Sequence, residues 1–236
     1  MGFFLKNARP IDAVIFDMDG LLIDTERLAL RALGAAANSM GTDVPEAFCR
    51  LLIGVPADQC RQMAWDRRGP DFPVQAYFES ADRYMTELIE AGQLRPKPAV
   101  CELLTWLEEQ RVPKAVAASS SRAKALDRLW NAGILSRFDT VVSRDDVQRG
   151  RPDPDLYLRA AETLGIPPAG CLALENSCNG VRAAHAAGIR VIMVPDLLAP
   201  TNEMQSMCET IVTDLHTVQS WLMHVNDGAS APAKAA

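Results

Sequence analysis

The sequence predicts an α/β fold: a core built on a parallel sheet, with a smaller all-helical domain inserted after the first strand. Three observations lead to this prediction. The apolar run Ala13–Phe16 has the length and composition of a buried strand. From Lys114 onward, short apolar runs alternate with helical stretches, which is typical of a parallel sheet covered on both faces. Residues 25–95 show helical patterns without a convincing strand.

The domain boundaries follow from this change of pattern. The α/β core is expected to comprise residues 11–24 and 96–226, and residues 25–95 are expected to form a helical cap. The Ala/Pro/Gly-rich stretch 227–236 is expected to be a disordered tail. The helices of the cap, separated by breaks rich in Gly and Pro, are expected at 28–36, 49–53, 57–65 and 74–90.

Five further strands are expected in the core, and helices separate them. The strands are predicted at 114–118, 140–143, 171–174, 189–194 and 210–212. The helices are predicted at 100–110, 122–130, 154–164, 180–187 and 215–225. Asp153 stands where it can cap the third of these helices, and Gly133, Gly165 and Gly188 stand at helix C-terminal stops.

Composition and charge exclude several classes of protein. The chain has 236 residues and a formal net charge of -6, without a Lys/Arg-rich run, which argues against a nucleic acid as partner. No apolar run approaches the ~18 residues of a membrane span, and the patch Phe3–Leu5 is too short for a signal-peptide core. The six cysteines lack C-x-x-C spacing and are expected to be free thiols in a reducing cytosol. We therefore expect a cytoplasmic monomer or weak homodimer.

Polar residues stand where the predicted strands end. Asp17 and Asp19 follow the first strand, Ser119 follows the second, and Glu175–Asn176 follow the fourth. Because ligands of open parallel sheets bind beyond the carboxyl ends of the strands, we expect these side chains to line one site. Mg²⁺ prefers oxygen ligands, so it suits two carboxylates, an amide oxygen and a backbone carbonyl at this edge. The cation would offset the repulsion between the acids and attract a phosphate group.

Each of these features also has a plainer interpretation when taken alone. Two acids after a strand are often a turn or a helix cap, Ser119–Ser121 could simply cap a helix, and Arg151–Pro152 could be a solvated loop. The plain interpretations weaken together, because the features occur at successive strand ends of one α/β pattern.

Four motifs in order carry a resemblance to a known family. DMDGLLIDTE, SSS, GRPDPDLY and LENSCNGVRAAHAAG resemble the motifs of the haloacid dehalogenase superfamily, in the branch with a helical cap after the first strand. Phosphoglycolate phosphatase and β-phosphoglucomutase belong to that branch. The resemblance implies a Rossmann-like core, a helical cap, and Mg²⁺-dependent hydrolysis of a small phosphorylated metabolite, such as a sugar phosphate or a phosphoglycolate-like compound, through an aspartyl-phosphate.

The resemblance also implies a role for each motif residue. Asp17 would be the nucleophile and Asp19 the general acid and base, while Ser119 and Arg151 would hold the phosphoryl group. The metal site would comprise Asp17, Asp19 through its backbone carbonyl, Glu175 and Asn176. The substrate-binding residues would be Gly54 in the cap segment LIGVPADQ and the strand-end residues Ser120, Ser121 and Arg122, although Ser121 and Arg122 have an equal claim as a plain helix start.

Two departures from the family pattern keep alternatives open. Arg151 stands where Lys is usual, and Asn176 stands where Asp is usual, which removes a negative charge from the metal site. A catalytically weakened phosphate-binding protein is therefore one alternative. A sugar-phosphate phosphomutase is another, although Pro56 and Ala57 occupy the places of residues that help such relatives grip a second phosphate.

Overall fold

The structure is a computed structural model that describes residues 10–53, 55 and 57–229. The chain divides into two compact units: one comprises residues 1–22 and 96–236, and the other comprises residues 23–95. Among the residues described, no helix combines the length and the apolar composition needed to cross a bilayer. The predicted substrate-binding residue Gly54 lies outside the described residues.

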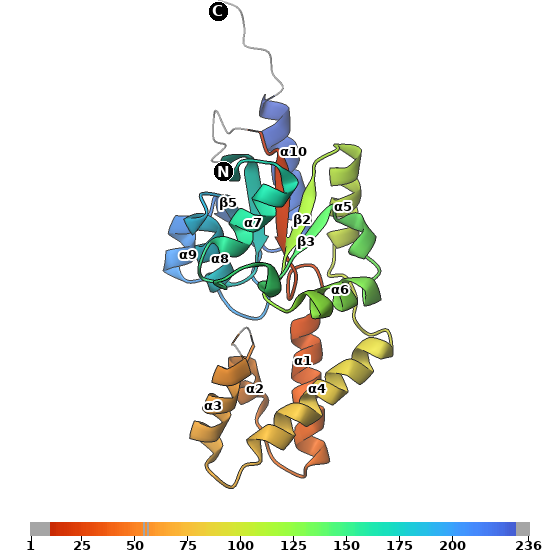
Figure 1. Cartoon of the computed structure of the whole chain (residues 1–236), viewed down its shortest axis with the longest axis vertical. Helices are drawn as coiled ribbons and strands as arrows, with labels where there is room; N and C mark the ends of the chain where they lie inside the picture. Colours follow the sequence, from red (N-terminus) through yellow and green to blue (C-terminus); the bar gives the residue numbers. More distant parts are fainter. Residues whose placement is uncertain (1–9, 54, 56, 230–236) are drawn as a thin grey trace, which may run out of the picture. The chain divides into compact units, whose positions relative to one another are not determined.

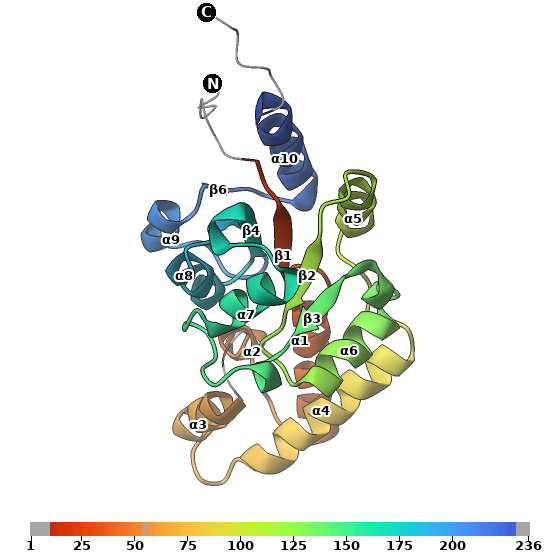
Figure 2. The ribbon, with the colours of Figure 1, turned by 45° about the horizontal axis from the view of Figure 1, so that its top comes forward.

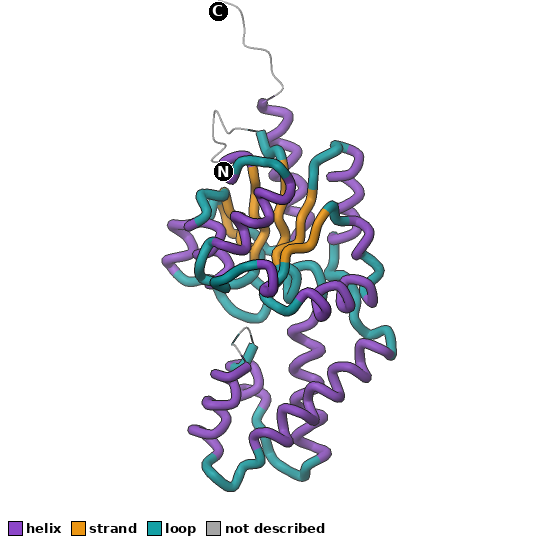
Figure 3. Tube along the Cα trace, viewed as in Figure 1, coloured by secondary structure: helices purple, strands orange, loops and turns teal. Residues whose placement is uncertain are grey.

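The first unit is built on one six-stranded sheet with the strand order β3-β2-β1-β4-β5-β6. Every neighbouring pair of strands is parallel, which confirms the predicted sheet. Figure 3 shows the strands side by side with helices around them. The strands are β1 (Ala13–Asp17), β2 (Lys114–Ala117), β3 (Thr140–Val142), β4 (Cys171–Glu175), β5 (Arg190–Met193) and β6 (Thr210–Ile211).

Helices cover both faces of this sheet, as the apolar strands require. Ala13 and Ile15 of β1 belong to a buried cluster with the helices α7 and α8, which cover one face (Figure 1). Side chains alternate along a strand, so Phe16 points to the other face, where its ring meets Phe138 edge to face at 5.8 Å. The helices are α5 (Val100–Glu109), α6 (Arg122–Asn131), α7 (Asp155–Leu164), α8 (Cys178–Ala186), α9 (Asn202–Met207) and α10 (Leu215–Ala229), with 3-10 turns η1 (Leu135–Arg137), η2 (Arg144–Asp146) and η3 (Pro168–Gly170). Figure 2 shows α5 and α10 apart from α7 and α8.

The second unit is helical throughout its regular structure. Its helices are α1 (Thr25–Ser39), α2 (Glu46–Leu51), α3 (Ala57–Arg68) and α4 (Val74–Glu90). Tyr77 of α4 is fully buried at its centre and donates a hydrogen bond to the carbonyl of Leu33, at 3.2 Å. Phe72 and Phe78 pack on the Tyr77 ring, each with centroids 5.3 Å from it. The unit therefore has an apolar core of its own.

Three details differ from the sequence-based expectations. Asp153 does not cap α7, because Pro154 occupies the cap position and the Asp153 carboxylate pairs with Arg149 at 3.2 Å. The helix α10 continues to Ala229, three residues into the predicted tail; residues 230–236 lie outside the described range. The short helix α9 was not predicted. Gly133, Gly165 and Gly188 do follow helices with positive φ, as expected.

Candidate active site

The carboxyl ends of the central strands bring two acids together. Asp17 ends β1 and pairs with Ala117 of β2, while Glu175 ends the neighbouring strand β4 one position beyond the Phe16–Leu174 pair. Asp17 is 4% exposed and Glu175 is fully buried. Because neighbouring parallel strands end at one edge of the sheet, residues far apart in the sequence meet here.

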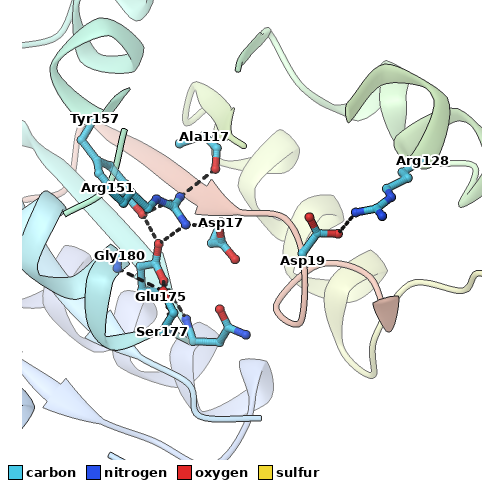
Figure 4. Close-up of polar contacts among 10 residues, drawn as sticks. Asp17, Asp19, Ala117, Arg128, Arg151, Tyr157, Glu175, Ser177 and Gly180 are labelled. Atoms are coloured by element: carbon cyan, nitrogen blue, oxygen red, sulfur yellow. Dashed lines mark hydrogen bonds and ion pairs between the residues drawn. The ribbon is translucent and has the colours of Figure 1, made fainter. Parts of the chain in front are cut away.

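Arg151 lies between these two carboxylates (Figure 4). Its Nη1 donates to Oδ1 of Asp17 at 2.5 Å and lies 2.9 Å from Oε1 of Glu175. Its Nη2 donates to the carbonyl of Ala117 at 2.8 Å. The loop between β3 and α7 delivers this side chain, which is 8% exposed. One buried guanidinium therefore faces two buried carboxyl groups, and it can balance the charge of only one of them.

Tyr157 of α7 completes this cluster. Its hydroxyl donates to Oε1 of Glu175 at 2.6 Å and accepts from Nη2 of Arg151 at 3.3 Å. The guanidinium of Arg151 lies over the Tyr157 ring, 5.3 Å from its centroid. Sequence reasoning missed this residue, since an aromatic side chain at helical spacing is usually a core residue. The signal was its place within GRPDPDLY, six positions after Arg151.

The start of α8 encloses the Glu175 carboxylate. Oε2 accepts from the backbone N–H groups of Asn176 and Ser177, both at 3.1 Å, and from the Ser177 hydroxyl at 3.0 Å. The Ser177 hydroxyl also accepts from the N–H of Gly180 and caps the helix. A Cβ at Gly180 would lie 1.9 Å from Oε1, so only glycine fits beside this carboxylate. Both oxygens of Glu175 are thus engaged, Oε1 by Tyr157 and Arg151 and Oε2 by the start of α8, and its role as a metal ligand stays a prediction.

Burial dominates the electrostatics of Asp17. It raises the pKa of Asp17 to about 8, although the charge of Arg151 opposes this and the charge of Glu175 adds to it. Burial also opposes the charge of Arg151, but the carboxylates of Glu175 and Asp17 outweigh it and raise the pKa of Arg151. Burial therefore disfavours the ionised form of Asp17, and a further cation beside it would favour that form.

Asp19 faces a different partner. Gly20 has a φ of 83°, and the N–H of Leu22 donates to the carbonyl of Met18, so the chain turns sharply after β1. Arg128 of α6 donates from Nη1 to Oδ1 of Asp19 at 2.7 Å. Figure 4 shows the Asp19 carboxylate facing Arg128, away from Arg151. Sequence reasoning missed Arg128, which stands in an ordinary amphipathic helix with no motif around it.

The serine run after β2 divides into exposed and structural positions. Ser119 is exposed, and Oγ of Ser120 is buried without a hydrogen-bond partner in the described part of the chain. Ser121 caps α6 by accepting from the N–H of Lys124 at 3.4 Å. Arg122 donates from Nη1 to the carbonyl of Val141 at 3.0 Å. The helix-start interpretation thus accounts for Ser121 and Arg122, and their contact with a substrate stays a prediction.

The predicted metal ligands fit a cation only in part. No group of three or more His, Cys, Asp or Glu side chains suited to a metal ion occurs among the residues that the structure describes. Oδ1 of Asp17 is held by Arg151, which leaves Oδ2 for a ligand. Asn176 directly follows Glu175 and is 6% exposed. One carboxylate oxygen, an amide oxygen and the backbone carbonyl of Asp19 make a weakly charged oxygen set, which suits Mg²⁺ that keeps several waters.

The chain is similar in sequence and in fold to known proteins. The profile of the family described as haloacid dehalogenase-like hydrolase matches residues 14–194. A phosphorylated carbohydrates phosphatase from Thermotoga maritima is 34% identical over 186 residues, which cover 77% of this chain and 84% of that protein. Protein CbbY from Rhodobacter capsulatus is 32% identical over 197 residues, which cover 78% and 86%. Among solved structures, a putative β-phosphoglucomutase from Thermotoga maritima matches with a TM-score of 0.79 at 29% identity, covering 91% of this chain and 100% of that one.

Proposed function

This chain belongs to the haloacid dehalogenase-like hydrolase family, and from that premise we propose that it hydrolyses the phosphate monoester of a small metabolite with Asp17 as nucleophile and Mg²⁺ as cofactor. This match confirms two predictions from the sequence: the family, and the enzyme class, a hydrolase. The observation that carries the proposal is the state of Asp17: it is buried at a strand end, with one oxygen held by Arg151 and the other left for a reaction.

The residues of the chain divide the chemistry between them. Arg151 and the hydroxyl of Ser119 hold the phosphoryl group while Oδ2 of Asp17 attacks phosphorus, so that an Asp17–phosphorus bond forms and the ester bond breaks. Asp19 gives a proton to the leaving oxygen. Asp19 then takes a proton from the water that attacks the aspartyl-phosphate, and phosphate leaves with Asp17 restored.

Asp17, the backbone carbonyl of Asp19 and Asn176 would hold Mg²⁺, and the fourth predicted ligand, Glu175, would share an oxygen that already accepts hydrogen bonds. When bound, the cation supplies positive charge that lets an anionic nucleophile approach an anionic substrate. Asn176 contributes an amide oxygen where a carboxylate would add charge, so we expect Mg²⁺ to bind more weakly than in an Asn176→Asp variant. Equal affinities in a metal titration of the two proteins would contradict this expectation.

The name of the phosphorylated carbohydrates phosphatase supports a sugar phosphate as the substrate class. The likeness to a putative β-phosphoglucomutase keeps phosphomutase activity as the second candidate. The two differ in their products, because a mutase returns an isomer of the sugar phosphate and a phosphatase releases free phosphate. A weakened protein would bind phosphate and yield neither product.

The test measures phosphate release from a panel of phosphorylated metabolites, with and without Mg²⁺. We expect release by the wild type only with Mg²⁺, and a loss of at least about 10³-fold in Asp17→Asn. Asp82→Asn makes the same change on the exposed face of α4 and should retain the wild-type rate. Equal rates in Asp17→Asn and the wild type would disprove the proposed role of Asp17. Conversion to an isomer without phosphate release would favour the mutase.

A further inference from the structure

The Arg128 side chain has more hydrogen-bonding capacity than it uses. It is 11% exposed, and its bond to Asp19 is the one side-chain hydrogen bond that it makes within the described residues. Its Nε is buried and has no hydrogen-bond partner there. A guanidinium carries five N–H donors, and a mostly buried donor without an acceptor costs free energy. The unused donors therefore call for an acceptor from outside the chain.

The proposed reaction would leave still more donors of Arg128 without an acceptor. Asp19 faces Arg128 in the structure, and it must face the ester oxygen of the substrate in order to give it a proton. When Asp19 turns, the guanidinium loses its carboxylate partner while it stays mostly buried. A buried charge that loses its partner is strongly destabilising, so the turn is favoured when another anionic group takes the place of Asp19.

We propose that Arg128 binds an anionic oxygen group on the leaving group of the substrate, a carboxylate or a second phosphate, in exchange for Asp19. The inference rests on the proposed function and names the substrate class of the same site. The position of Arg128 decides which end of the substrate it meets: Asp19 serves the leaving oxygen, so its ion-pair partner lies on the leaving-group side.

The contacts of Arg151, the second arginine of the site, explain why Arg128 is the one proposed to bind the anionic group. Arg151 is committed to Asp17, Glu175 and the carbonyl of Ala117, all of which belong to the end that binds the phosphoryl group. Within the described residues Arg128 has one side-chain partner, Asp19, which must turn to the ester oxygen in the proposed reaction. A guanidinium offers two parallel N–H donors to a carboxylate or a phosphate, which favours an anion over a neutral hydroxyl.

The experiment compares matched substrates that differ by one charged group. Phosphoglycolate is paired with 2-hydroxyethyl phosphate, and propane-1,3-diol bisphosphate is paired with the monophosphate. For each pair the ratio of kcat/KM, anionic over neutral, is measured in the wild type, Arg128→Gln, Arg128→Lys and the control Arg159→Gln. Arg159 forms an exposed ion pair with Glu162 on α7, so its loss removes one positive charge outside the site.

We expect the wild type and Arg159→Gln to favour the anionic member of at least one pair by about 10- to 100-fold, the range of a hydrogen bond to a charged group. The pair that shows the preference tells a carboxylate from a phosphate. Arg128→Gln should bring the ratio close to one, and Arg128→Lys should keep part of it because the charge remains.

An unchanged ratio in Arg128→Gln would overturn the proposal. If kcat/KM falls by the same factor for both members of a pair, the ratio stays unchanged and Arg128 acts only through Asp19. If the wild type releases no phosphate from any compound, the proposed function fails instead, and calorimetric binding of the same compounds to wild type and variants then tests Arg128 by itself. Arg128→Lys provides the comparison if melting curves show that Arg128→Gln does not fold.

Discussion

Two arginines meet two aspartates in the core unit, and they are held in opposite ways. Arg151 makes contacts with Asp17, Glu175, Ala117 and Tyr157, and every one of these partners is buried. Arg128 donates to Asp19, whose side chain is 35% exposed. The difference teaches that a cluster with many partners can serve as a fixed support, whereas a pair with one bond can exchange its partner for a ligand.

The largest contrast is expected in stability. Arg151→Met leaves two buried carboxylates without their cation, and we expect a loss of about 3–5 kcal/mol in the free energy of unfolding. Arg128→Met breaks a pair whose acid is partly exposed, and we expect a loss below about 1 kcal/mol. Chemical unfolding of both variants at one pH measures the difference. Losses of equal size would refute the contrast between the two arginines.

The next effect concerns pH. Because burial raises the pKa of Asp17 to about 8, the folded protein without metal holds this proton more tightly than the unfolded chain does. The contribution of this carboxyl to stability is therefore greatest below its unfolded value of 3.8 and falls as the pH rises toward 8. The measurement is the free energy of unfolding of wild type minus Asp17→Asn between pH 5 and 9, with a chelator present. A flat difference would show that Asp17 is ionised throughout.

A smaller effect on stability is expected from the hydroxyl of Tyr157, which contacts both Arg151 and Glu175. Tyr157→Phe removes a hydroxyl that donates to a buried carboxylate, and hydrogen bonds to charged groups contribute about 1.5–3 kcal/mol. Tyr77→Phe is the matched control in the helical unit, where the hydroxyl donates to a neutral carbonyl, and it should cost about 1 kcal/mol. The rate of phosphate release should fall in Tyr157→Phe alone, and an identical response of the two variants would leave Tyr157 an ordinary core residue.

The smallest effect tests how closely the chain encloses Glu175. Gly180→Ala places a methyl group against the carboxylate, and we expect overpacking to cost about 1–3 kcal/mol. Gly34→Ala in α1 is the control, because nothing lies within 4 Å of its added Cβ, and it should raise stability by up to about 1 kcal/mol. Thermal melting of both variants measures the opposite signs. A neutral Gly180→Ala would mean that Glu175 can move.

Most of the fold could be predicted from the sequence, because it depends on local patterns. Short apolar runs mark five of the six strands, β6 being only Thr210–Ile211, and the glycines that follow three core helices mark their ends. The predicted Asp153 cap was wrong by one position, because Pro154 occupies the N-cap and the Asp153 carboxylate pairs with Arg149 four residues earlier. The order of the strands across the sheet lies outside what periodicity determines.

The residues of the candidate site show the same difference between what local patterns predict and what they do not. Residues that end strands, Asp17 and Glu175, could be predicted together because parallel strands share an edge. Arg128 and Tyr157 stand within regular helices, where spacing marks them only as a surface position and a core position. Arg128 meets an acid 109 positions away in the sequence, and only the packed structure reveals such a pair.

The place of β1 within the sheet has a consequence for how activity is lost. This strand is flanked by β2 and β4, so its amide groups are bonded on both sides and should exchange with solvent among the slowest in the protein. The carboxylate of Asp17, the proposed nucleophile, is fixed to the end of that strand. Mild denaturant that abolishes turnover while the exchange of β1 stays slow would therefore reveal damage at the periphery, with Asp17 still in its place.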